Sequence, residues 1–577
     1  MHALETAAQQ WLETLSRRKP SAVDAEDLRV SLESGVNGLL NSLSAVKERL
    51  NELTLPFLLP PELLAHVFSF LAYPDAAKSA FTGERRAKAW SWTAVTHVCR
   101  RWRRTAISTP SLWTRLSPDM RPPWEVFLDR AKDAPLKIDG FNQYNASPFH
   151  FRLIHGHRHH IHTLVLTGLN RADTCDAVAC LIGSLPMLET LLIKPKDAYD
   201  DPPELPPNFL SDVAPRLREL TLVGVRFPWD TGSALLKTFR HDVRPRRFRN
   251  HQPSPAHPTL STVLRTLQQM PALETLVLEI YPPAGSVDSL TFSHGSNTVS
   301  LLNLRALRLA SHDDSCWHLW SRLRMPPTAI LSICAMERNQ PIALIADLLR
   351  RCVLASPLPN FSSIDVSFSE SREPGKNVVI KLGKGAHQST YSDPGYQDTT
   401  ARVRFTEPVV VLDICTDRHA NDMVVREILR DVHFDNIRIL SISLESNAPW
   451  DSTVFYDTFL RLRSVTTFKL FGMCAAAASI CAALVPISPP EPGSSFTSGG
   501  HASEIIFPAL EELDCFRVDF STSARNRTGH ELLGRDALTQ MLERRVSWFG
   551  MRLRKLGIRA CQISNEEVDV WEKYVRT

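Results

Sequence analysis

The chain has 577 residues, of which 43% are hydrophobic and 22% charged, a mixture typical of a folded globular protein and unlike that of a wholly disordered chain. Lys and Arg total 66 against 62 Asp and Glu, and the resulting net charge of +4 argues against a protein built mainly to hold nucleic acid or a membrane surface. The 40 prolines against 23 glycines predict many short elements separated by fixed turns, which argues against an uninterrupted helical bundle.

The cysteines and the first residues indicate the compartment. The 11 cysteines are scattered and no pair has CxxC spacing, so they form neither a secreted disulfide framework nor a zinc-site pattern. The opening residues, MHALETAAQQWLETLSRRK, lack the basic start and apolar core of a signal peptide. We therefore expect a soluble protein of the cytoplasm, the nucleus or both.

Residues 1–57 are expected to form a polar helical region. Its apolar residues alternate at steps of four and three, the heptad spacing of a helix with one apolar seam. The seam consists of Leu32, Val36, Leu39, Leu43, Val46, Leu50 and Leu53. Pro56 ends the helix. Two interpretations stay open: an amphipathic helix that packs on the next domain, or a short coiled coil that dimerises.

Residues 58–118 are expected to form a small unit of short helices rich in aromatic residues. Its two main segments read LLPPELLAHVFSFL and WSWTAVTHVCRRWRRTAISTPSLWTRL. Pro60 and Pro61 suit the start of the first helix, where a missing N–H costs nothing. So small a unit cannot bury Phe68, Phe70 and its tryptophans together, and leftover apolar surface of this kind often marks a partner site.

Three blocks within this unit resemble an F-box in their residues, order and spacing. The blocks are Leu59-Pro60-x-Glu62-Leu63-Leu64-x-x-Val67-Phe68-x-x-Leu71, Val98-Cys99-Arg100-x-Trp102 and Pro110-x-Leu112-Trp113. The stretch 72–91 between the first two blocks is longer than in compact family members and is interpreted as an insertion. The resemblance implies docking onto a Skp-type adaptor of a cullin–RING (SCF-type) ubiquitin ligase.

Adaptor contact is expected at the start of the first helix and along the helix edges, where aliphatic side chains would anchor in a partner groove. The best candidates for contact are Leu59, Pro60, Leu63, Val67 and Phe68. The residues expected in the core of the unit itself are Leu71, Cys99 and Trp102. The full candidate set is Leu59, Pro60, Glu62, Leu63, Val67, Phe68, Leu71, Val98, Trp102, Leu112 and Trp113.

Residues 119–160 are expected to connect this unit to a repeat array over 161–577. An apolar-x-x-apolar-x-apolar template recurs there at steps that are mostly 24 to 33 residues, close to the period of about 20–29 residues in leucine-rich repeats. Copies begin at Ile161, Leu188, Leu217, Leu273, Leu304, Thr328, Phe361, Val409, Ile437, Val465, Leu510 and Leu553. The near-copies LPMLETLLI, APRLRELTL, MPALETLVL and FPALEELDC favour a repeat over the alternative, ordinary strands of an α/β domain.

The array resembles the degenerate leucine-rich repeats that accompany many proteins of the large fungal F-box family. The predicted fold is therefore α/β, with an N-terminal helix and a small all-α F-box followed by an irregular leucine-rich-repeat-type solenoid. Template residues would point inward, and the residues between them would face a protein target. These target-facing candidates are Thr190, Leu192, Glu219, Thr221, Thr275, Val277, Ala306 and Arg308.

Three loop insertions are predicted, near 236–258, 370–400 and 486–505. The first contains KTFRHDVRPRRFRNH, residues 237–251, with six Lys or Arg residues and one Asp. We interpret this segment as a mobile basic loop, with an acidic partner or a nuclear import signal as the alternatives.

Motifs that carry chemistry are absent from the sequence. HGHRHHIH at 155–162 gathers five histidines, but no acidic or cysteine ligand is nearby, so it is interpreted as a polar loop or edge, with a metal site as the alternative. HELLG at 530–534 lacks the second histidine of a zincin helix, and no phosphate-binding loop, nucleophile elbow or kinase loop occurs. We predict no catalytic residue, no enzymatic activity, and no metal or other cofactor.

The leading hypothesis is a substrate-recognition subunit. Its F-box would bind the Skp-type adaptor and cullin complex, and its repeats would hold a protein target close to the ubiquitin-charged enzyme, which raises the effective concentration of the target. The alternative is an F-box and repeat scaffold that binds a partner without ubiquitination. A hidden enzyme would need a nucleophile–base pair that the sequence does not offer, and a nucleic-acid binder would rest on 237–251 alone. No membrane partner is expected.

Overall fold

Placement is determined for most of the chain in the computed structural model. The described residues are 24–54, 58–72, 91–120, 123–197, 201–229, 231–243, 258–280, 298–336, 340–355, 361–370, 376–383, 410–416, 421–430, 436–444, 450–472, 476–489 and 505–575, with short stretches within 5–13 and single residues at 432 and 434. The predicted insertion near 486–505 lies mostly outside them.

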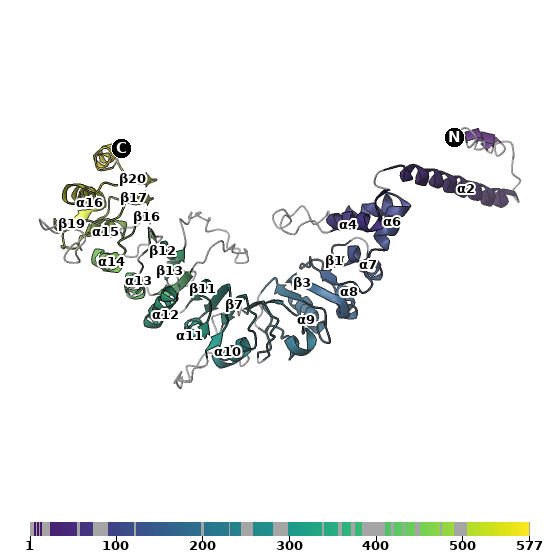
Figure 1. The fold of residues 1–577 in the computed structure, drawn as a ribbon, viewed down its shortest axis with the longest axis horizontal. Coiled ribbons are helices and arrows are strands. Elements are labelled where there is room, and N and C mark those ends of the chain that lie inside the picture. The colour runs from purple at the N-terminus through teal and green to yellow at the C-terminus, as the bar shows by residue number, and fades with distance from the viewer. Residues whose placement is uncertain are drawn as a thin grey trace. The chain divides into compact units, whose positions relative to one another are not determined.

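Two compact units divide the chain, Met1–Ile138 and Asp139–Thr577. The first is mostly helical, and the second is built on a large, mainly parallel sheet (Figure 1). The protein is therefore a mixed α/β protein with a helical N-terminal region, as predicted. Among the helices that the structure describes, none is both long and apolar enough to cross a membrane.

The first unit is a series of short elements that follows one long helix. Its elements are α2 (Asp24–Glu52), α4 (Pro61–Ala72), η2 (Ser91–His97), α6 (Arg100–Ile107), η3 (Pro110–Trp113), β1 (Arg115–Leu116), α7 (Trp124–Ala131) and β2 (Leu136–Ile138). Pro61 opens α4, where no intrahelical N–H bond is lost. At the start of α6 the Trp102 N–H donates to the Cys99 thiol over 3.4 Å.

Helix α2 exposes its heptad seam. Between 37% and 59% of the residue surface is exposed at Val36, Leu39, Leu43, Val46 and Leu50. Glu48, on the opposite side of the helix, lies 3.5 Å from Arg100 of α6. The interpretation in which this seam packs on the next domain is therefore wrong, because α2 meets α6 through its polar side.

The second unit alternates strands and helices along the chain. Its elements up to residue 335 are α8 (Pro148–Gly156), η4 (Arg158–His160), β3 (Ile161–Leu169), α9 (Arg171–Ala179), β4 (Thr190–Pro195), η5 (Phe209–Val213), β5 (Glu219–Val223), β6 (Thr238–Asp242), α10 (Leu260–Gln268), β7 (Thr275–Ile280), β8 (Val299–Ser300), β9 (Ala306–Ser311), α11 (Ser315–Arg322), β10 (Leu323–Arg324) and β11 (Ile330–Ala335). The later elements are α12 (Ile342–Leu354), β12 (Ser363–Glu370), β13 (Lys376–Gly383), β14 (Val410–Thr416), α13 (Asn421–Leu429), β15 (Ile439–Leu444), α14 (Ser452–Phe459), β16 (Thr467–Phe471), α15 (Ala476–Ala483), β17 (Glu512–Phe516), β18 (Ser523–Arg525), β19 (Glu531–Leu533), α16 (Gly534–Phe549), β20 (Lys555–Arg559) and α17 (Asn565–Glu572).

One sheet runs through this second unit. Its strand order is β3-β4-β5-β6-β7-β9-β11-β14-β13-β12-β15-β16-β17-β20, and every strand except β13 runs in the same direction. Helices α9 to α16 lie along one side of these strands (Figure 1). The apolar strand residues are buried beneath the helices, and among the described residues no helix covers the other face of the sheet.

Template residues form buried ladders across the sheet. Leu191 pairs with Leu220 and Leu276 with Leu307, and each is at most 1% exposed. Successive strand residues point to opposite faces, so the residues between the template positions lie on the open face. The template therefore predicts both the strands and their buried side, whereas a leucine-rich-repeat solenoid stays a prediction.

The loop predicted near 236–258 begins as a strand. Strand β6 pairs in parallel with β5 and β7, and Leu236 and Phe239 are fully buried. The template was missed because His241 occupies its third apolar position. Burial of Phe239 against the Phe227 ring, at 4.9 Å between centroids, supplies the apolar contact that makes this segment a strand. The rest of the basic segment, from 244, lies outside the described residues.

The insertion predicted near 370–400 also contains a strand. Strand β13 runs antiparallel between β12 and β14, so the strand order is locally reversed. Val378, Ile380 and Leu382 alternate along β13 and are fully buried. This period of two in KNVVIKLG is a strand signal that the six-residue template does not contain.

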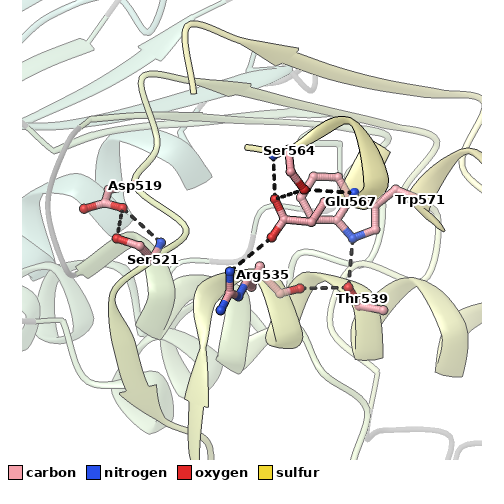
Figure 2. A network of polar contacts seen from close by, with 7 residues as sticks. All are labelled: Asp519, Ser521, Arg535, Thr539, Ser564, Glu567 and Trp571. Atoms are coloured by element: carbon pink, nitrogen blue, oxygen red, sulfur yellow. Dashed lines mark hydrogen bonds and ion pairs between the residues drawn. The ribbon is translucent and has the colours of Figure 1, made fainter. Parts of the chain in front are cut away.

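The end of the second unit is held by a polar network between α16 and α17 (Figure 2). The Ser564 N–H donates to Glu567 over 2.8 Å while the Glu567 N–H donates back to the Ser564 hydroxyl, a capping box. Glu567 also pairs with Arg535 of α16 at 3.5 Å. The buried Trp571 indole donates to the Thr539 hydroxyl over 2.8 Å, which fixes α17 against α16.

Substitution Ser564→Ala should loosen α17 locally. Loss of an N-cap costs about 1 kcal/mol, so we expect amide hydrogens of α17 to exchange about fivefold faster by hydrogen–deuterium exchange. Asp569→Ala, at an exposed position of the same helix, should leave exchange nearly unchanged. Equal acceleration in both variants would show that the capping box does not hold α17.

Candidate functional site

Helix α4 carries apolar residues on two sides. Leu64, Phe68 and Ala72, spaced four residues apart, are at most 5% exposed. On the other sides of the helix, the exposed fractions are 53% for Leu63, 46% for Val67, 66% for Phe70 and 52% for Leu71. We call these four residues the α4 apolar face. The remaining side of the helix is polar and carries Glu62, His66 and Ser69. A helix whose wide apolar surface is only partly buried is suited to a partner.

The buried side of α4 is fixed by α6. The Phe68 ring lies 5.2 Å from the Trp102 ring, and the Arg101 guanidinium donates to the Leu59 carbonyl at the turn before α4. These contacts hold both the rotation of α4 and the position of the Leu59-Pro60 turn. The α4 apolar face is consequently directed away from α6.

An aromatic core supports the helices of this unit. Trp113 packs against Trp92 and Phe127, with both pairs of ring centroids 4.9 Å apart. The Trp113 indole donates to the Ala106 carbonyl over 2.7 Å, and the Arg130 guanidinium lies over the Trp113 ring at 4.2 Å. Trp113 is therefore a structural residue of the unit.

The candidate adaptor-binding residues divide into three groups. The exposed ones are Pro60, Glu62, Leu63, Val67, Leu71 and Val98. Those of intermediate exposure are Leu59 and Trp102. The buried ones are Phe68, Leu112 and Trp113.

Two of the expected roles on α4 are exchanged in the structure. Phe68 was predicted to contact the adaptor, but it is fully buried against Trp102. Leu71 was predicted to lie in the core, but it is exposed. Phe70, absent from the candidate set, is the most exposed residue of the α4 apolar face. The buried Leu112 and Trp113 are likewise core residues and offer no docking surface.

Residues 57–119 match the family model of the F-box-like domain. The predicted F-box is thus confirmed, and it contains the whole α4 apolar face. No curated protein matched the chain. The leucine-rich-repeat and fungal-family parts of the resemblance stay predictions.

The target-facing candidates all lie on strands of the second unit, outside the buried ladders. Glu219 is exposed, and the other seven are of intermediate exposure: Thr190, Leu192, Thr221, Thr275, Val277, Ala306 and Arg308. Strand register aligns Thr190 with Glu219, Leu192 with Thr221, and Val277 with Arg308. The open face of the sheet therefore brings these side chains together in rows.

Charged residues missing from the candidate set join Arg308 on the open face of the sheet. Arg240, Arg308 and Lys381 share one row of the strand register, on β6, β9 and β13. Glu279 and Asp413 share the next row, two residues further along β7 and β14. Between β6 and β13 the open face thus presents a basic row beside an acidic row, and the basic row ends at Asp365 of β12, which pairs with Lys381.

Asp413, in the acidic row, lies beside a cysteine of the neighbouring strand. The Cys334 thiol donates to it over 3.6 Å, and burial raises the pKa of the Asp413 carboxyl despite nearby Lys381 and Arg308. Burial also raises the pKa of Cys334. A thiol held in its protonated form is a poor nucleophile, so the pair is not arranged for covalent catalysis. Sequence reasoning missed this cluster because it missed β13.

The histidine segment, interpreted as a polar loop or edge, runs from the end of α8 through η4 into β3, with His160 buried. His157 Nδ1 lies 3.2 Å from His160 Nε2, and the His159 and His160 rings stack at 4.4 Å. Within the described part of the chain, no three His, Cys, Asp or Glu residues are grouped so that they could hold a metal ion. Burial, followed by the neighbouring His160 and His159, lowers the pKa of His157 below 6.5.

Substitutions Phe68→Ala and Leu71→Ala should separate the two sides of α4. Removal of the buried Phe68 ring is expected to lower the free energy of unfolding by about 3–5 kcal/mol, measured by thermal or urea denaturation. Leu71→Ala should change it by no more than about 0.5 kcal/mol, because its side chain is exposed. Comparable losses in both variants would contradict the assignment of Phe68 to the core.

Acidification should destabilise the second unit through His157. The pKa of His157 in the folded protein lies below 6.5, so the unfolded chain binds the proton more tightly than the folded chain. The free energy of unfolding therefore falls as the pH drops from 6.5 to the pKa of the folded state. We expect His157→Gln to flatten this part of the curve of unfolding free energy against pH. His97→Gln, at an exposed histidine of the first unit, is the control. An unchanged slope in His157→Gln would refute the assignment.

Proposed function

We propose that the protein is a substrate-recognition subunit of an SCF-type cullin–RING ubiquitin ligase. The observation that supports this most strongly is the α4 apolar face, which lies inside the region that matches the F-box-like domain. F-box-like domains generally dock their ligase complexes through a Skp-type adaptor. Four apolar side chains exposed on one short helix supply the kind of anchors that such a docking site needs.

Adaptor docking is assigned to the α4 apolar face and the turn before it. Leu63, Val67 and Leu71 repeat at steps of four, so their side chains line one strip of the helix. Leu59 and Pro60 extend this strip at its start. Phe68 contributes by holding α4 in place and has no direct contact with the adaptor.

Target binding is assigned to the open face of the sheet in the second unit, interpreted as an irregular leucine-rich-repeat-type solenoid. The strand rows that contain Thr221, Val277 and Arg308 offer polar, apolar and basic contacts side by side. A partner segment that crosses the strands would meet the basic row on one flank and the acidic row on the other. Binding there would act by raising the local concentration of target near the ligase, with no bond-making by this chain.

Adaptor binding is tested with Leu63→Ala/Val67→Ala. Truncation of two central aliphatic anchors should weaken the complex with a purified Skp-type adaptor by about a hundredfold in isothermal titration calorimetry. The matched control is Ile182→Ala/Leu302→Ala, which removes two aliphatic side chains from the second unit that are even more exposed. Unchanged affinity of the first variant, with its circular dichroism preserved, would refute docking through the α4 apolar face.

Cullin binding and ubiquitin transfer distinguish a ligase subunit from a scaffold without ligase activity. The adaptor complex should bind cullin and support ubiquitin transfer to a protein that copurifies with the chain. Val277→Arg should abolish capture of that protein but leave adaptor binding intact, because it changes only the open face of the sheet. Adaptor binding without cullin association would favour the scaffold.

A further inference from the structure

The exposed seam of α2 has the pattern of a two-stranded coiled coil. Val36, Leu43 and Leu50 occupy the a positions of three successive heptads. The d positions are occupied by Leu32, Leu39, Val46 and Leu53. Within its own unit the helix leaves these side chains largely in water, with Leu43 and Leu50 more than half exposed. A long helix is stabilised mainly by burial of its apolar seam, so we expect a second helix to cover this one.

The side of α2 that meets its own unit is the opposite one. Glu48 stands at an f position, directly across the helix from the a/d seam, and its partner is Arg100 of α6 at 3.5 Å. Contact with α6 therefore leaves the seam free. A partner on the seam would not compete with α6.

Charges beside the seam select the orientation of that partner. Glu33 and Lys47 both occupy e positions, with Leu40 midway between them, and all three are exposed. In an antiparallel pair e positions face e positions, so Glu33 of each copy meets Lys47 of the other and Leu40 meets Leu40. In a parallel pair g positions face e positions, and Lys47 would meet the uncharged Ser42.

The core layers of the antiparallel arrangement that involve Leu32 to Leu50 are apolar, and at each end Leu53 faces Arg29, the preceding a position. With Leu40 at the twofold axis, Leu39 packs in a layer with Leu43 of the second copy, Val36 with Val46, and Leu32 with Leu50. Arg49 already pairs with Glu52 of its own helix, and across the interface it would meet Gly35, so no like charges oppose each other. We propose that α2 joins two copies of this chain as an antiparallel two-stranded coiled coil.

The test is sedimentation velocity of the full chain over about a hundredfold range of concentration. Wild type should pass from monomer to dimer as its concentration rises. Leu43→Glu places a charge in the central layer and should raise the dissociation constant by about a hundredfold or more. Asn37→Glu, the same charge change on the outer side of α2, should leave it within about twofold. A wild-type monomer at every concentration, or a dimer unaffected by Leu43→Glu, would overturn the proposal.

Charge reversal tests the orientation. Glu33→Lys or Lys47→Glu alone should raise the dissociation constant by about tenfold, since like charges then face each other at two places. The double variant Glu33→Lys/Lys47→Glu restores opposite charges across an antiparallel pair and should recover wild-type affinity. These two residues are too far apart along the helix to meet in a parallel pair. Failure of the double variant to recover affinity would overturn the antiparallel arrangement.

Discussion

Packing of Phe68 against Trp102 decides which side of α4 remains for a partner. The apolar surface of this 12-residue helix is so wide that either part of it could be buried. The Trp102 ring on α6 holds Phe68 in the core, and Leu63, Val67, Phe70 and Leu71 are left in water as a consequence. Because the docking surface is defined by this one contact, a change at Phe68 acts on binding only through the fold.

In the second unit, the repeated burial of template residues determines which side chains remain on the open face of the sheet. From β3 to β17 each parallel strand places the same two template positions in buried ladders beneath the helices, so the open face repeats from strand to strand. The reversed order of β14, β13 and β12 interrupts this regularity. It also brings Lys381 and Asp413 beside Arg308, which gives the middle of the open face a charge pattern that the regular repeats lack.

Sequence reasoning succeeds where a pattern has one physical meaning. The six-residue template requires alternate burial, and the strands that it predicts from Leu191 to Ile558 are present. It fails at β6, where His241 replaces an apolar residue, and at β13, whose apolar residues follow the simple period of two. On α4 the pattern shows that too many apolar residues are present, but the choice between Phe68 and Leu71 depends on where α6 lies. That choice is made by tertiary packing, which no local pattern contains.

The central claim is that the α4 apolar face touches the Skp-type adaptor. The most direct measurement is site-specific photocrosslinking, with a photoreactive residue placed at Leu71 and, as control, at Ile182 in the second unit. The account predicts a crosslink to purified adaptor from position 71 and none from position 182. Adaptor that binds the chain without crosslinking at position 71, while crosslinking from the second unit, would contradict it.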